Sequence, residues 1–211
     1  AGPIALSIAE ALTKRGVKTK MIIRSRMLRT LIEPDLSLIV QKRVEKAGVE
    51  CLLNVEVDEI VGSNNVECIS VSGKKIDTSI VIFATGIRPF VKLAGEAGVK
   101  LGRYGISTDE RMRTSVSEIF AAGDCVETID FMTRKPTYLP IGSIAAQEGS
   151  IAGVNAAGGD MHTDGFLRVR ADTLFGMDIT SMGHGSETAK ALGIEVNVAD
   201  VKSSQSCINP Y

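Results

Sequence analysis

The order of helical and strand patterns in the first fifty residues constrains the fold of this chain more than any other feature. Apolar side chains recur at helical spacing from Ile4 onward, and Gly16 then favours the end of a helix. The short β-branched segment 17–23 follows, and a second helical pattern runs from Leu36 to Gly48. Alternating helices and strands favour an α/β fold with parallel strands.

The segment after Gly48 has the composition of several short strands separated by turns. We expect strands at residues 49–55, 57–61, 66–71 and 80–84. A small antiparallel meander inserted before a last parallel strand fits this order best. Glycine and proline interrupt the pattern directly afterwards, so we place a domain boundary near residue 86.

The rest of the chain changes pattern twice. A glycine-rich stretch contains a short strand at 119–123 and leads to a helix of small side chains at 141–157. From Gly165 on, strands at 166–169, 177–182 and 194–201 surround a short helix at 186–192. The sequence therefore predicts three units, which span residues 1–86, 87–163 and 164–211.

The charge balance excludes several classes of partner. The 24 basic and 25 acidic residues give a net charge of −1, which leaves no cationic excess for nucleic acid or an anionic membrane. The apolar runs are far shorter than the ~20 residues that a membrane-spanning helix needs. The four cysteines form no CxxC pair and only two histidines are present, so we expect no metal site. With no leader-like start, we expect a cytoplasmic protein.

The first five residues, AGPIA, look like the end of a glycine-rich dinucleotide-binding turn. Gly2 would let a pyrophosphate approach the backbone, while Pro3 and Ile4 begin a helix whose N-terminal N–H groups favour an anion. An ordinary helix start after a glycine is the alternative.

Three arginines lie where such a fold meets the adenosine ribose, about twenty residues after the glycine turn. A carboxylate at this position would accept a hydrogen bond from the 2′-hydroxyl of NADH. Arg24, Arg26 and Arg29 instead suit the 2′-phosphate of NADPH, although NADH stays possible. A solvated basic loop is the alternative.

Two later motifs carry a family resemblance. They are Thr85-Gly86-Ile87-Arg88-Pro89 and the segment TSVSEIFAAGD at residues 114–124. Together with the opening, they resemble the pyridine nucleotide-disulfide oxidoreductases, the flavoprotein class of glutathione reductase, coenzyme A-disulfide reductase and NADH oxidase. The resemblance implies that Thr85 and Gly86 join an NAD(P)H domain back to an FAD domain. It also implies that Asp124 accepts hydrogen bonds from the ribityl chain of FAD, with Gly123 allowing the flavin close to the backbone.

The resemblance extends over essentially the whole chain. Residues 140–149 match the family helix that runs from the flavin ring, which adds Ile141 and Ser143 to the cofactor-binding candidates. The segments 174–183 and 209–211 look closest to the coenzyme A-disulfide reductase and NADH oxidase branch. The implied architecture is a Rossmann-like NAD(P)H-binding domain without its first strand, the C-terminal part of an FAD-binding domain, and the start of an α+β dimerisation domain.

The implied activity is hydride transfer from NADPH to FAD and on to a small-molecule disulfide or other acceptor, in a homodimer. The resemblance implies that the redox cysteine lies upstream of this chain. Cys51, Cys68, Cys125 and Cys207 themselves fit structural positions better than a redox role. His162 and His184 are expected in loops. No catalytic residue is therefore assigned within the chain.

Two alternatives and two departures accompany this interpretation. The chain could be a nucleotide-binding and dimerising module without turnover, or part of a ferredoxin or rubredoxin reductase, which lacks the redox cysteine. Family members often have an aromatic residue where Pro3 stands and a glutamate where Ser7 stands. Both changes affect the nicotinamide pocket.

Overall fold

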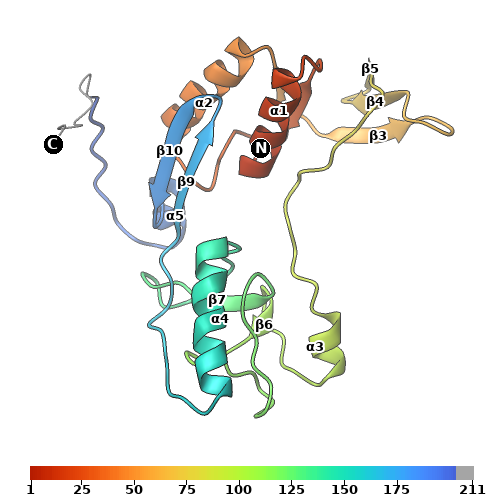
Figure 1. The fold of residues 1–211 in the computed structure, drawn as a ribbon. Helices are drawn as coiled ribbons and strands as arrows, with labels where there is room; N and C mark the ends of the chain where they lie inside the picture. Colours follow the sequence, from red (N-terminus) through yellow and green to blue (C-terminus); the bar gives the residue numbers. More distant parts are fainter. Residues whose placement is uncertain (203–211) are drawn as a thin grey trace.

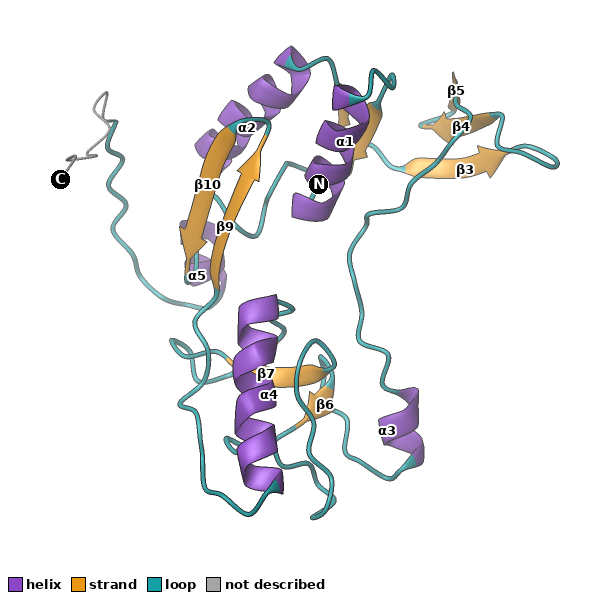
Figure 2. Cartoon of the chain, viewed as in Figure 1, coloured by secondary structure: helices purple, strands orange, loops and turns teal. Residues whose placement is uncertain are grey.

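The computed structural model describes residues 1–202 and consists of two bodies joined by long connections (Figure 1). One body contains the N-terminal helices together with the hairpin and helix that follow residue 168 (Figure 2). The other contains the elements from residue 92 to residue 156, and a small separate sheet at residues 57–77 lies apart from it. Among residues 1–202, no helix is both long enough and apolar enough to cross a membrane.

The first body begins as the sequence predicts, with helix, strand, helix and strand. Its elements are α1 (Pro3–Lys14), β1 (Lys20–Ile23), α2 (Pro34–Lys46) and β2 (Glu50–Leu53). Both helices have a proline in their first turn, where the missing N–H costs nothing. β1 and β2 pair in parallel, with Lys20 opposite Glu50 and Ile23 opposite Leu53. The parallel α/β start is thus confirmed.

A separate antiparallel sheet follows and has the order β3-β4-β5. Its strands are β3 (Val57–Val61), β4 (Cys68–Val71) and β5 (Lys74–Asp77). Ser72 and Gly73, with φ of 50° and 75°, form the tight turn between β4 and β5. The sequence predicts the first two strands and the turn, but it misses β5.

The prediction of a strand at residues 80–84 is wrong. The segment is extended without strand pairing, and Ile80, Ile82 and Phe83 are 71%, 50% and 71% exposed. An apolar run becomes a strand only when another strand completes its hydrogen bonds. Within residues 1–202 no strand lies beside this segment.

The second body contains α3 (Lys92–Glu96), β6 (Ile106–Ser107), β7 (Val126–Ile129), β8 (Pro136–Thr137) and α4 (Gly142–Ala156). The sheet order is β6-β7-β8, parallel and then antiparallel. α4 matches its prediction. The strand predicted at 119–123 is reduced to one isolated bridge between Phe120 and Arg113. Ile144 and Ile151 of α4 anchor a core with Met112 and Phe166.

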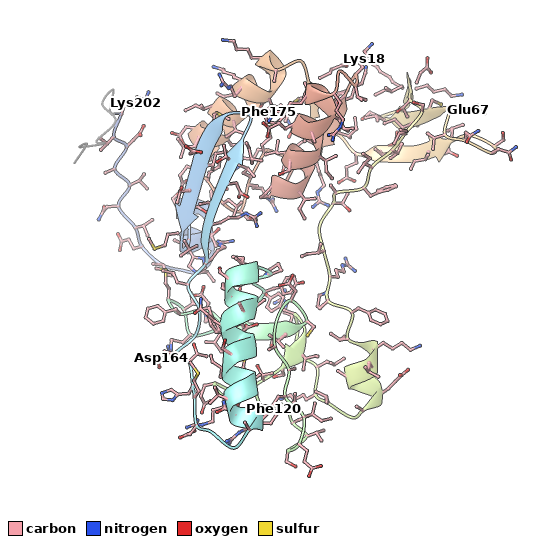
Figure 3. All side chains as sticks on the ribbon, viewed as in Figure 1. Lys18, Glu67, Phe120, Asp164, Phe175 and Lys202 are labelled. Atoms are coloured by element: carbon pink, nitrogen blue, oxygen red, sulfur yellow. The ribbon has the colours of Figure 1, made fainter. Side chains whose placement is uncertain are left out.

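The last elements return to the first body. β9 (Val169–Leu174) and β10 (Met177–Met182) form an antiparallel hairpin, and α5 (Ser186–Ala191) follows. Phe175 lies at the tip of the hairpin, next to α1 and α2 (Figure 3). Leu174 and Phe175 share one core with Leu6 and Val44. The predicted strand at 194–201 is absent, since this segment is exposed and unpaired in the described chain.

Candidate functional site

The N-terminus of α1 and the carboxyl ends of β1 and β2 meet at one edge of the first body. The carbonyl of Ala1 accepts a hydrogen bond of 2.7 Å from the N–H of Leu28, which lies in the loop after β1. β1 ends at Ile23 and its neighbour β2 ends at Leu53. In open α/β sheets, ligands bind outside the carboxyl ends of the strands. The sheet therefore places the predicted nucleotide loop where such a ligand would sit.

The start of α1 is suited to an anion. Gly2 occupies the N-cap position, no side chain caps the helix, and its first turn contains no acidic residue. A Cβ added to Gly2 would meet no described atom within 4 Å, so this side of the turn is open. Uncapped N–H groups at the positive end of a helix favour phosphate. Pro3 and Ile4 contribute to this turn as predicted, and Ile4 is 55% exposed.

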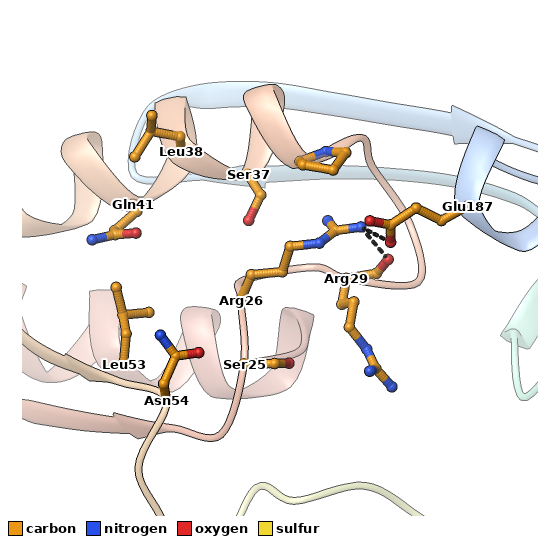
Figure 4. A pocket seen from close by; sticks show the side chains of 10 residues that line it. Ser25, Arg26, Arg29, Ser37, Leu38, Gln41, Leu53, Asn54 and Glu187 are labelled. Atoms are coloured by element: carbon orange, nitrogen blue, oxygen red, sulfur yellow. Dashed lines mark hydrogen bonds and ion pairs between the residues drawn. The ribbon is translucent and has the colours of Figure 1, made fainter.

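A cavity of about 480 Å³ opens between the loop after β1, the start of α2 and the end of β2 (Figure 4). Small-molecule sites commonly measure ~300 to 1,000 Å³. The walls combine leucines with polar and charged side chains; the lining residues are Ser25, Arg26, Arg29, Pro34, Ser37, Leu38, Gln41, Leu53, Asn54 and Glu187. A cavity of this size and lining can hold the adenosine part of a dinucleotide.

The three predicted arginines have different surroundings. The side chain of Arg24 is 78% exposed and its Nε lies 3.6 Å from Glu56. Arg29 is exposed and lines the cavity. Arg26 is largely covered and donates hydrogen bonds of 2.8 Å and 3.0 Å to the carbonyls of Ile32 and Arg29. Arg29 thus borders the cavity and Arg26 shapes the loop, whereas Arg24 follows β1 without lining the cavity.

A second group of predicted residues gathers around the first turns of α4. Gly123 has φ of 88°, and a Cβ added there would lie 3.8 Å from the Cβ of Ala145 in α4. Ile141 is the N-cap of α4, and Ser143 is exposed in its first turn. Asp124 is exposed next to Gly123, and its carbonyl accepts a hydrogen bond of 3.1 Å from the hydroxyl of Tyr138.

Glu148 holds this turn in place and was missed by the sequence analysis. It is 2% exposed on α4, and its Oε2 accepts a hydrogen bond of 2.9 Å from the N–H of Gly123. Burial raises the pKa of the Glu148 carboxyl, an effect that the Gly123 hydrogen bond opposes. The available signal was its spacing, because Glu148 shares the buried helix face of Ile144 and Ile151.

Thr85 and Gly86 belong to neither group. Both are exposed in the extended connection between the two bodies, where Gly86 has φ of 127°. The structure thus brings together Gly2, Pro3, Ile4 and the arginines at one edge, and Gly123, Asp124, Ile141 and Ser143 at another. Their roles as cofactor ligands stay predictions.

The cysteines within the described residues have the surroundings of unreactive thiols. Burial, followed by the charge of Glu45, raises the pKa of Cys51 to about 11. Burial also raises the pKa of Cys125, and Cys68 is buried. Cys207 and the segment 209–211 lie outside the described residues. No group of three or more metal-ligating side chains occurs within residues 1–202.

Both histidines lie outside helices and strands, but His184 is more enclosed than a surface loop residue. Its side chain is 12% exposed, and its Nε2 lies 3.1 Å from Oδ2 of Asp130. Asp130 also accepts a hydrogen bond of 2.7 Å from the N–H of Thr133. The pair therefore joins the loop after β10 to the end of β7.

The sequence of this chain is similar to those of several known proteins. Residues 1–175 match the family model described as pyridine nucleotide-disulphide oxidoreductase. An NADH oxidase from Methanocaldococcus jannaschii is 42% identical over 75% of this chain and 36% of its own length. A CoA-dependent NAD(P)H sulfur oxidoreductase from Pyrococcus furiosus is 34% identical over 96% of this chain and 46% of its own length. The chain thus spans less than half the length of these two relatives.

Solved structures show the same fold. An NAD-dependent persulfide reductase from A. fulgidus superposes with a TM-score of 0.88 at 32% identity, covering 92% of this chain and 36% of the other. An engineered water-forming NADPH oxidase, derived from a Lactobacillus brevis NADH oxidase, was solved with NADPH bound. It superposes with a TM-score of 0.85 at 27% identity, covering 92% of this chain and 43% of the other.

Proposed function

The chain belongs to the pyridine nucleotide-disulphide oxidoreductase family, and from this premise we propose that it is part of an FAD-dependent oxidoreductase that prefers NADPH to NADH. The observation that carries the nucleotide preference is the cavity at the ends of β1 and β2. A cationic side chain, Arg24, directly follows β1, and Arg29 lines the cavity. A carboxylate typical of NADH binding is missing at that position.

The described residues fit NADPH in three respects. The uncapped first turn of α1 would hold the pyrophosphate through its N–H groups. The cavity would hold the adenosine, with Leu38 and Leu53 beside it. Arg24 and Arg29 would bind the 2′-phosphate through charge-assisted hydrogen bonds. In support, the engineered NADPH oxidase carries two introduced arginines and an aspartate replaced by alanine.

The turn at Gly123 and Asp124 would hold FAD. The exposed Asp124 carboxylate would accept hydrogen bonds from ribityl hydroxyls, and Glu148 keeps the turn fixed through the Gly123 N–H. Gly123 adopts a left-handed backbone conformation that other residues rarely take. When bound, the flavin supplies the electron acceptor for hydride from the nicotinamide.

The final acceptor in this proposal is a small-molecule disulfide or persulfide. Support comes from the relatives, which include a CoA-dependent NAD(P)H sulfur oxidoreductase and an NAD-dependent persulfide reductase. The redox thiol would lie outside residues 1–202, because Cys68 is buried and partial burial raises the pKa values of Cys51 and Cys125. We further propose a cytoplasmic homodimer without nucleic-acid or membrane partners, in keeping with the net charge of −1.

Nucleotide titration tests the proposal. The protein should bind NADPH several-fold more tightly than NADH, a difference of ~1 to 2 kcal/mol for charge-assisted contacts at a partly exposed site. Arg24→Glu should remove this preference. Arg15→Glu, the same charge change at the exposed C-terminal end of α1, should leave it intact. Equal affinity for the two nucleotides in the unmodified protein would refute the assignment of the 2′-phosphate site.

The flavin half is tested through Asp124→Ala. Loss of hydrogen bonds to a charged group should weaken FAD binding by ~1.5 to 3 kcal/mol. The nucleotide site is distant, so NADPH affinity should change little. Asp77→Ala, on the exposed face of β5, is the matched control. An unchanged FAD dissociation constant would show that Asp124 only completes the turn.

A further inference from the structure

A carboxylate from the C-terminal part of the chain enters the proposed adenosine cavity. Glu187 belongs to α5, yet it lines the cavity together with Arg26 and Arg29 (Figure 4). Its Oε2 accepts a hydrogen bond of 2.6 Å from the guanidinium of Arg26. The contact joins residues 161 positions apart in the sequence.

Hydrogen bonds other than the one between Arg26 and Glu187 hold α5 in this position. The approach of Glu187 to the cavity therefore does not depend on its side-chain rotamer alone. The N–H and hydroxyl of Ser186 each donate a hydrogen bond of 2.6 Å to Glu33, which lies directly before α2. A Cβ added to Gly185 would lie 3.0 Å from Oε1 of Glu33, so the glycine permits this close approach. Glu33 thus fastens α5 to the loop that carries the arginines.

The charge of Glu187 affects the two nucleotides differently. A phosphate monoester carries ~1.5 to 2 negative charges at neutral pH, so a nearby carboxylate repels it. Glu187 also neutralises Arg26, which would otherwise add to the attraction by Arg24 and Arg29. A ribose 2′-hydroxyl is uncharged and can donate a hydrogen bond to a carboxylate. The same side chain therefore disfavours NADPH and tolerates NADH.

We propose that Glu187 is a specificity-determining residue that limits the preference of this protein for NADPH over NADH. This inference rests on the proposed nucleotide site and adds a determinant from the part of the chain after β10. Arg26 keeps its position without Glu187, because the carbonyls of Ile32 and Arg29 also hold its guanidinium. Removing the charge of Glu187 therefore leaves a cation available to the 2′-phosphate.

The decisive substitution is Glu187→Gln, which keeps the length of the side chain and an oxygen that accepts from Arg26. Calorimetric titration of the protein with NADPH and with NADH should show the NADPH/NADH affinity ratio rising about three- to tenfold, through tighter NADPH binding. Glu187 is 56% exposed, so the effect should shrink in high salt, where charges are screened beyond ~3 Å at 1 M. Glu187→Asp, which retains the charge, should keep the ratio near that of the unmodified protein.

Glu50→Gln is the matched control. Glu50 also forms an ion pair, at 2.9 Å to Lys20, but it lies at the opposite end of β2 from the cavity. Its substitution should leave the ratio unchanged. An unchanged ratio in Glu187→Gln, with NADPH still preferred, would overturn this inference alone. Failure of the unmodified protein to bind either nucleotide would overturn the proposed function and this inference with it.

Discussion

Replacing Glu148 with alanine should destabilise the protein, and the loss should be larger in mild acid than at neutral pH. Glu148 is 2% exposed and accepts the hydrogen bond from Gly123. Alanine leaves that partly buried N–H without its partner, which costs up to ~3 kcal/mol. It also leaves unfilled space on the face of α4 that packs with Ile144 and Ile151. We expect a total loss of about 2 to 4 kcal/mol when the carboxyl is protonated.

The pH dependence follows from the direction of the pKa shift. Burial raises the pKa of Glu148 above its ordinary value of 4.5, so the folded state binds a proton more tightly than the unfolded state. Its stabilising contribution is fully present below that value and is lost as the pH rises through the folded pKa. The alanine variant lacks this dependence, so its deficit in unfolding free energy narrows towards neutral pH.

Urea unfolding of the two proteins between about pH 4.5 and pH 7.5 measures the deficit, which should shift the midpoint by about 1 M for a typical urea slope. Glu148→Gln separates the hydrogen bond to Gly123 from the ionisation of the carboxyl, because its amide oxygen can accept the hydrogen bond without carrying a charge. We expect the glutamine variant to equal or exceed the unmodified protein at neutral pH. A deficit of Glu148→Ala that grows with pH would refute the reasoning, as would a glutamine variant as unstable as the alanine variant.

The remaining predictions concern a thiol, a buried carboxylate and the core. Cys51, with a pKa of about 11, should react with a thiol reagent at about pH 8 roughly a hundredfold more slowly than an exposed cysteine, as measured by mass spectrometry of labelled peptides. For Asp130, burial raises the pKa, but hydrogen bonds from Thr133 and the nearby His184 outweigh it and lower the pKa below 3.8, so its contribution is present above that value and lost as the pH falls through the folded pKa. Asp130→Asn should therefore lower the unfolding free energy at neutral pH, and its difference from the unmodified protein should disappear in acid. A difference in unfolding free energy that does not change with pH in urea titrations would contradict this. Leu6→Ala, at a fully buried position, should cost ~2 to 5 kcal/mol in the same assay, whereas Ile4→Ala, at a 55% exposed position, should cost less than ~0.5 kcal/mol.

Local patterns in the sequence predict what local forces determine. The apolar spacing before Gly16 gives α1, and the small residues of 141–157 give α4, because each helix completes its own hydrogen bonds. The segment 80–84 has an equally clear strand pattern, yet the prediction of a strand is wrong there. A strand depends on a neighbouring strand that the pattern does not specify. The family prediction from the motifs at 85–89 and 114–124 is confirmed, since residues 1–175 match that family.

The candidate sites were predictable only in part, because contacts between distant segments position some of their residues. Arg24 and Arg29 could be located by counting from Gly2, because a strand end fixes where the next side chain lies. The different role of Arg26 depends on its bonds to Ile32 and to Glu187, and the second of these crosses most of the chain. The spacing of Glu148 places it on the buried face of its helix, but its bond to Gly123 depends on how two separate segments pack. Contacts between distant segments are not encoded in local periodicity.

The hairpin tip at Leu174 and Phe175 bears on how proteins of this architecture can be recombined. Because both residues belong to the core of the first body, and Arg43 of α2 donates a 2.9 Å hydrogen bond to the carbonyl of Phe175, the hairpin is not a separable module. A chimera that exchanges the chain after residue 163 on its own would leave α1 and α2 with a mismatched interior. A workable chimera exchanges the hairpin together with both helices. The loop after β1 and the C-terminal segment are then inherited as one unit.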